Sequence, residues 1–121
     1  MKSERSYVDY LRDILEYTAV AGDLLGDMPL QEFEADRRTH LAVVRALEII
    51  GEAARQVPDA VRRRYPEVPW GDVIGMRHKV IHGYFGVDLR VVWETVRDDL
   101  PPLRAAIARM LEDFERGRHR T

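Results

Sequence analysis

The residues best suited to chemistry lie in one short stretch, Gly75-Met76-Arg77-His78-Lys79-Val80-Ile81-His82-Gly83-Tyr84. Arg77 is a permanent cation, and a guanidinium binds phosphate in a bidentate manner. His82 carries an imidazole, which titrates near neutrality and can move a proton. Tyr84 adds a phenol two residues later. Together these groups suit phosphodiester chemistry, so the stretch is predicted to be a functional site.

Arg77 and His82 do not share a face of an unbroken α-helix. Five residues at about 100° each leave the two side chains about 140° apart around the helix axis. They converge on one substrate only where the helix is ending, and Gly83, directly after His82, is a suitable C-terminal stop. The glycine is therefore part of the predicted site.

Two other interpretations of the stretch were weighed. His78 and His82 are four residues apart and would share a helix face, as two imidazole ligands of a metal would. Lys79 stands where a metalloprotease helix carries glutamate, and the chain has no cysteine, so no metal is predicted.

A purely structural interpretation stays open as well. A histidine near a helix C-terminus interacts with the helix dipole, and Arg77 has Asp72 and Asp88 as potential ion-pair partners in the sequence.

The elements that must position this stretch are predicted to be helices. Apolar residues recur at three-and-four spacing, and no segment alternates as a strand would. Helices are expected over residues 6–25, 30–34, 38–56, 58–65, 70–83 and 89–100, with an extended connector at 66–69 and a break at Pro101-Pro102 before a last helix. Phe33 is expected to anchor the second of these helices to the core, and Asp88 to cap the helix at 89–100. The helix at 38–56 is apolar on two sides, so it is either central or shared with a partner chain.

Composition limits the classes of function. The 121 residues suffice for one domain, assigned to 1–116 with a basic tail at 117–121. The net charge of −2 argues against a protein that coats nucleic acid through its global field. The absence of cysteine, of a signal-like N-terminus and of a membrane-spanning apolar run leads us to expect a cytoplasmic protein with no membrane contact.

The stretch also matches a family pattern. Arg77, four residues, His82, one residue and Tyr84 resemble the Arg-x4-His-x-Tyr signature of HepT-like toxins in the HEPN superfamily. The bare spacing is a weak signal, but the resemblance extends in order over nearly the whole chain. It includes Tyr10-Leu11-Arg12-Asp13-Ile14, Phe33-Glu34-Ala35-Asp36, Leu47-Glu48-Ile49-Ile50-Gly51-Glu52-Ala53, Pro69-Trp70, and Tyr84-Phe85-Gly86-Val87-Asp88 through Trp93 to Asp99-Leu100-Pro101.

This resemblance implies an all-α, HEPN-type up-and-down bundle of about five or six helices that forms a homodimer. It implies a metal-independent endoribonuclease without a cofactor, in which the Arg77 and His82 residues of two chains form a composite site. His82 is expected to act as general base on a ribose 2′-hydroxyl, and Arg77 to stabilise the charge on phosphorus. The substrate must then be RNA, because DNA has no 2′-hydroxyl.

The family also implies a toxin of a type VII-like toxin–antitoxin pair. Its partner would be a minimal nucleotidyltransferase antitoxin that attaches AMP to Tyr84, and a higher toxin–antitoxin assembly is open. His78 stands where relatives often carry a small polar residue, so it is a supporting residue whose role is undefined. Glu52 is expected to be a buried acid that orients Arg77 or forms a structural ion pair.

Two alternatives to a ribonuclease toxin remain. One is a non-catalytic helical module that binds RNA or a nucleotidyltransferase without turnover. The other is an antitoxin-like role. The sequence contains no recognisable base-reading element, so it does not define the RNA target.

Overall fold

The computed structural model describes residues 4–76 and 88–120, with the side chains of residues 7–76 and 88–117. Within these ranges the chain is helical and has no strand, which confirms the predicted all-α class. In chain order the elements are α1 (Glu4–Leu25), α2 (Leu30–Ala35), α3 (Arg37–Gln56), α4 (Asp59–Arg64), α5 (Trp70–Ile74), α7 (Leu89–Glu94), the π-helix η1 (Thr95–Asp99) and α8 (Leu100–Arg120).

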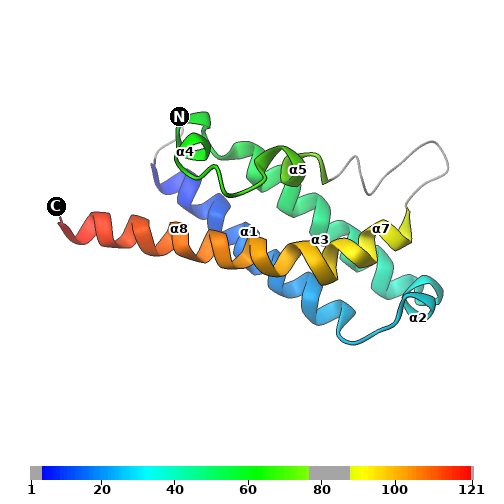
Figure 1. The fold of residues 1–121 in the computed structure, drawn as a ribbon. Helices are drawn as coiled ribbons and strands as arrows, with labels where there is room; N and C mark the ends of the chain where they lie inside the picture. Colours follow the sequence, from blue (N-terminus) through cyan, green and yellow to red (C-terminus); the bar gives the residue numbers. More distant parts are fainter. Residues whose placement is uncertain (1–3, 77–87, 121) are drawn as a thin grey trace.

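Three long helices form the body of the molecule (Figure 1). α1 packs against both α3 and α8, and α3 runs antiparallel to α1. Their facing stripes supply most of the fully buried side chains, which include Leu11, Ile14, Leu47, Ile50 and Ile107. The three-and-four spacing of the sequence therefore maps onto a single core.

α3 packs against α1 and also contacts α2, α5 and α7. Both of its apolar rows turn inward, because Val43, Ala46, Leu47, Ile50, Ala53 and Ala54 are all buried. Leu41 is the main exception, with 56% of its surface exposed. The two-sided apolar pattern is thus accounted for by packing within one chain.

The short helices close the ends of the bundle. Phe33 of α2 is fully buried, as predicted for an anchor. Asp36 then caps α3, because its carboxylate accepts a hydrogen bond of 3.1 Å from the Thr39 backbone N–H. That bond lowers the pKa of Asp36 below its ordinary value.

The predicted break at Pro101-Pro102 is wrong. α7, η1 and α8 follow one another without a loop, and the two prolines lie in the first turn of α8. A proline lacks an N–H and its ring clashes with the carbonyl four residues earlier. The π-helical turn just before the prolines widens the helix, with the Leu100 N–H bonded to the Thr95 carbonyl five residues back, and this accommodates them.

Two smaller expectations also differ from the structure. Residues 66–69 form a turn and not an extended connector, because the Val68 N–H bonds to the Tyr65 carbonyl at 3.1 Å. The single helix expected from Trp70 to Gly83 is interrupted, since α5 ends at Ile74 with Gly75 as its C-cap. α8 continues to Arg120 and so includes most of the expected basic tail.

None of the helices in the described ranges combines the length and the apolarity that crossing a membrane requires.

Candidate active site

The predicted catalytic stretch lies outside the described residues. Arg77, His78, His82, Gly83 and Tyr84 all fall in the range 77–87. The structure defines the two points at which the chain enters and leaves this range, Met76 and Asp88. The candidate site is therefore defined by these two anchors and by the elements that hold them.

The first anchor is α5 with Met76. Trp70, Val73 and Met76 are buried, and the Trp70 indole N–H donates to the Tyr65 carbonyl at 3.0 Å. Gly75 ends the helix, with its N–H bonded to the Gly71 carbonyl at 2.9 Å. The residue directly before Arg77 is thus packed into the core.

Gly51 of α3 allows α5 to approach this closely. A Cβ atom added at Gly51 would lie 3.2 Å from the Val73 carbonyl oxygen and 3.4 Å from that of Ile74. Both carbonyls belong to the last turn of α5, so the end of the helix rests on the bare backbone of α3. In the sequence this glycine lies among the apolar residues of α3. A glycine at such a position can indicate a close contact between helices, because it has no side chain to keep them apart.

The second anchor is Asp88, which caps α7 as predicted. Its carboxylate accepts hydrogen bonds from the backbone N–H groups of Arg90 and Val91, at 3.1 and 3.2 Å. Trp93 then ties α7 to the rest of the fold, because its indole N–H donates to the Met28 carbonyl at 2.9 Å. The residues that flank the predicted catalytic stretch on both sides are therefore held by the helical body.

Glu52 is not the buried acid that was expected. Its side chain is 56% exposed, lies 3.6 Å from the Arg55 guanidinium and accepts a hydrogen bond of 3.1 Å from the Gln56 amide. It lines a shallow hollow of about 180 Å³ between α1 and α3. Of the two roles considered, the structural ion pair agrees with the described residues, and any contact with Arg77 lies outside them.

The metal alternative gains no support from the described part of the chain. No group of three or more His, Asp or Glu side chains there is arranged to hold a metal ion. His40, the one histidine whose side chain lies in the described ranges, packs edge-on against Phe33 with ring centroids 6.1 Å apart. The pair His78 and His82 lies outside those ranges.

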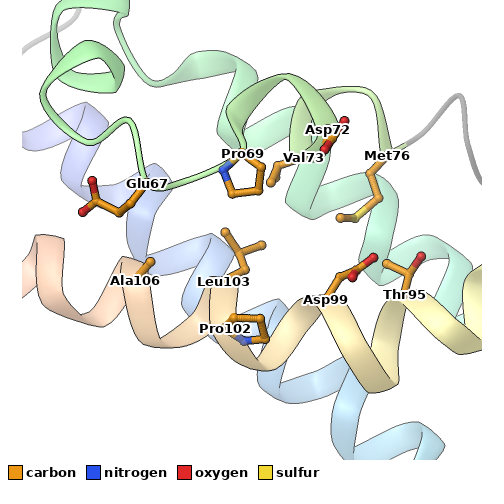
Figure 2. A pocket seen from close by; sticks show the side chains of 10 residues that line it. All are labelled: Glu67, Pro69, Asp72, Val73, Met76, Thr95, Asp99, Pro102, Leu103 and Ala106. Carbon is orange, nitrogen blue, oxygen red and sulfur yellow. The ribbon is translucent and has the colours of Figure 1, made fainter.

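Sequence reasoning missed a cavity of about 320 Å³ beside the first anchor. Figure 2 shows it between α5 on one side and η1 with α8 on the other. Met76 contributes to its wall, so the cavity reaches the residue next to Arg77. Among the described residues, three carboxylates and no basic side chain line it, so this part of its wall offers no cation to the phosphates of a nucleic acid.

Comparison with known proteins gives consistent matches over most of the chain. The family model described as "Ribonuclease HepT-like" matches residues 9–110. A protein of Thermococcus cleftensis named "Probable ribonuclease HepT" is 43% identical over 107 residues, which cover 88% of this chain and 97% of that protein.

Two further relatives carry the name "Putative RNase". One, from Methanocaldococcus jannaschii, is 38% identical over 112 residues, which are 93% of each chain. The other, from Caldanaerobacter subterraneus, is 35% identical over 112 residues, covering 93% of this chain and 97% of that protein. No solved structure matches the chain.

Proposed function

The chain belongs to the HepT-like ribonuclease family, and from this premise we propose that it is a metal-independent endoribonuclease whose catalytic groups are Arg77 and His82. The observation that carries the proposal is the Arg77-x4-His82-x-Tyr84 motif in a chain that matches the family over residues 9–110. The two anchors, buried Met76 and the helix cap Asp88, support it, because catalytic groups must be held by a rigid scaffold to act together.

The reaction begins at a ribose 2′-hydroxyl. Neutral His82 takes the hydroxyl proton, and the 2′-oxygen attacks the adjacent phosphorus. The bond from phosphorus to the 5′-oxygen breaks, and that oxygen leaves with a proton that His78 or solvent supplies. The products are a 2′,3′-cyclic phosphate and a 5′-hydroxyl end, so neither an oxidant nor a metal is needed.

Arg77 acts on the phosphate. Its guanidinium pairs with two non-bridging oxygens and stabilises the additional negative charge that develops on them in the transition state. Fixed donors of this kind contribute about 100- to 1,000-fold to rate.

The site is proposed to be completed by a second copy of the chain. The 140° separation of Arg77 and His82 on a regular helix disfavours a site built from one uninterrupted helix. The two apolar rows of α3 do not argue for a dimer, since both are used inside the chain. Exposed Leu41 and Leu24 are the large apolar side chains that the described surface leaves for a partner.

The biological setting is proposed to be a toxin with a nucleotidyltransferase antitoxin. Transfer of AMP to the Tyr84 phenol would place a negatively charged, bulky group two residues from His82. RNA would then be excluded both electrostatically and sterically. Intact mass measured after co-expression with a minimal nucleotidyltransferase should show added AMP, and Tyr84→Phe should abolish the addition.

The test of catalysis compares two pairs of variants. Arg77→Ala and His82→Ala should each lower RNA cleavage by about 100-fold or more. Arg63→Ala and His119→Ala are matched controls, because they remove the same groups elsewhere in the chain and should leave cleavage unchanged. Cleavage should survive chelation by EDTA and should give cyclic phosphate ends.

Other outcomes would identify other functions. Undiminished cleavage by Arg77→Ala or by His82→Ala overturns the proposed mechanism. Loss of cleavage on chelation would favour a metal at His78 and His82. Salt-sensitive RNA binding without products would indicate the non-catalytic module.

A further inference from the structure

Two side-chain hydrogen bonds of the described residues join segments that are far apart in the sequence. The Tyr65 hydroxyl donates to the Asp113 carboxylate at 3.0 Å, across 48 positions. The Trp93 indole N–H donates to the Met28 carbonyl at 2.9 Å, across 65 positions. One bond therefore holds the chain before residues 77–87, and the other holds the chain after them.

Tyr65 connects α8 to the start of α5. Its hydroxyl reaches Asp113 in α8, and its carbonyl accepts a hydrogen bond of 3.0 Å from the indole N–H of Trp70, the first residue of α5. The backbone N–H of Val68, in the turn between α4 and α5, donates to the same carbonyl at 3.1 Å. A shift of Tyr65 relative to α8 is thus passed on to the first turn of α5.

α5 depends on such contacts for its position. It has five residues, and isolated helices shorter than about 12 residues are marginal in water. On one side it rests on Gly51 of α3, but toward α8 it borders the cavity of about 320 Å³. The turn that follows Tyr65 contributes Glu67 and Pro69 to the wall of this cavity. The Tyr65–Asp113 bond therefore links the α5 segment to α8 where the described residues leave a hollow between them.

Both partners of this bond are fixed. The second carboxylate oxygen of Asp113 accepts a hydrogen bond from the Arg116 guanidinium, nearly one turn further along α8. Burial and the bond to Asp113 raise the pKa of the Tyr65 hydroxyl, so that it remains a donor throughout the neutral range. The link is thus present under the conditions in which a ribonuclease is assayed.

Trp93 holds the other flank. It lies five residues after Asp88, the cap of α7. Its indole N–H is bonded to the Met28 carbonyl in the turn between α1 and α2, and the Arg97 guanidinium covers its ring at 4.5 Å from the centroid. The bond ties α7, and with it Asp88, to the α1–α2 turn.

We propose that Tyr65 and Trp93 are positioning residues of the ribonuclease, an inference that rests on the proposed function. Tyr65 acts through α5 on Met76, and Trp93 acts through α7 on Asp88. Together they set the distance between the points at which the chain enters and leaves the predicted catalytic stretch. A misplacement of about 1 Å can cost about 100-fold in rate, so the loss of either bond lowers kcat although neither side chain contacts RNA.

The test is steady-state cleavage of a short RNA by the full-length protein, well below its Tm. Tyr65→Phe, which removes only the hydroxyl, should lower kcat by about three- to tenfold and change KM by less than about twofold. Trp93→Phe, which removes the indole donor, should act in the same way. The midpoint of the pH dependence of kcat should stay in place, because neither residue transfers a proton.

Two comparisons separate positioning from stability. Thr18→Val also removes a hydrogen bond, the 2.8 Å bond to the Leu15 carbonyl, but it lies in α1 outside both flanks, and its kcat should equal that of wild type. Asp113→Asn keeps an acceptor oxygen for Tyr65 and should retain most of kcat, whereas Asp113→Ala should fall as far as Tyr65→Phe. The double variant of Tyr65→Phe and Asp113→Ala should be no slower than either single one.

Hydrogen exchange provides a readout that needs no RNA. Exchange of the α5 amides should become faster in Tyr65→Phe, and that of the α7 amides in Trp93→Phe. Circular dichroism at the assay temperature confirms that each variant is folded.

Three results would overturn the proposal. The first is a kcat of Tyr65→Phe and Trp93→Phe as high as that of Thr18→Val. The second is an equal fall in kcat for Asp113→Asn and Asp113→Ala, and the third is unchanged exchange of α5 and α7. Failure of the proposed function is distinguished by His82→Ala, because cleavage by that variant at the wild-type rate would remove the reaction itself.

Discussion

Replacing Gly51 by alanine tests directly how the chain that leads to Arg77 is held. Gly51 is buried in the C-terminal part of α3, where the last turn of α5 rests on it. An added Cβ would lie 3.2 Å from the Val73 carbonyl oxygen, 3.4 Å from that of Ile74 and 3.8 Å from the Met76 Cβ. The first two contacts are tight and involve backbone, which cannot rotate away as a side-chain end can.

Two opposing effects determine the size of the change. At an open helical position, glycine to alanine raises the free energy of unfolding by about 0.5–1 kcal/mol. Overpacking a tight contact costs about 1–3 kcal/mol. The net expectation for Gly51→Ala is therefore a loss of up to about 2.5 kcal/mol, or a fall in Tm of up to about 10 °C for a chain of this size.

The measurement is thermal and urea unfolding followed by circular dichroism. Gly22→Ala in α1 is the matched control, because an added Cβ there meets nothing within 4 Å. It should raise the free energy of unfolding by up to about 1 kcal/mol. If Gly51→Ala is as stabilising as Gly22→Ala, the close approach of α5 to α3 is not what the structure describes.

Three further changes address the caps and the pH dependence. Tyr65→Phe removes the 3.0 Å hydrogen bond from the phenol to Asp113 and should cost about 0.5–1.5 kcal/mol in urea unfolding. Burial and this bond raise the pKa of Tyr65 above 10.0. The protonated phenol therefore contributes its full stabilisation below pH 10, and this stabilisation is lost as the pH rises further. Between pH 9 and 11 the wild-type protein should lose more stability than Tyr65→Phe. The hydrogen bond from the Thr39 N–H lowers the pKa of Asp36 below 3.8. The stabilisation by the carboxylate is therefore present above pH 3.8 and disappears as the pH falls through the pKa of the folded state. Between pH 5 and 2 the free energy of unfolding should fall less steeply with pH in Asp36→Ala than in wild type, and an equal slope would contradict the cap. Asp88→Ala should lower the free energy of unfolding by about 1 kcal/mol, whereas Asp88→Asn should retain most of the capping stabilisation. Equal losses for the two variants in calorimetry would show that Asp88 does not stabilise the helix as a cap.

The sequence predicts the helical elements well because local signals determine them. The apolar spacing and capping residues place α1, α3 and α4 within about two residues of their observed bounds. Phe33 as an anchor and Asp88 as an N-cap are confirmed for the same reason. These features depend on neighbours in the sequence.

Features that depend on contacts between distant segments could not be predicted in this way. Pro101-Pro102 indicates a break by its local chemistry, but the π-helical turn at Thr95–Asp99 absorbs both prolines while α8 stays packed on α1. Glu52 is expected from the sequence to be buried, but its side chain faces solvent, whereas the adjacent Gly51 faces α5. This difference depends on how α3 packs against α1 and α5, which local sequence does not determine. No sequence pattern indicates that the residues of the cavity belong together, because only the fold brings Glu67, Thr95 and Asp99 to one place.

The predicted catalytic stretch begins directly after Met76, which also lines the cavity, and the two differ in charge. Met76 is packed in the core, lines the cavity and directly precedes Arg77. The cavity side carries Glu67, Asp72 and Asp99, which repel phosphate, whereas the stretch beyond Met76 begins Arg77-His78-Lys79. Under the proposed function, the phosphates of RNA are therefore repelled by these acids and attracted by the cationic stretch, although the net charge of the chain is −2. Neutralising the cavity acids with Asp72→Asn and Asp99→Asn together should leave RNA affinity equal or greater, and a loss of affinity in salt-dependent binding measurements would contradict this division.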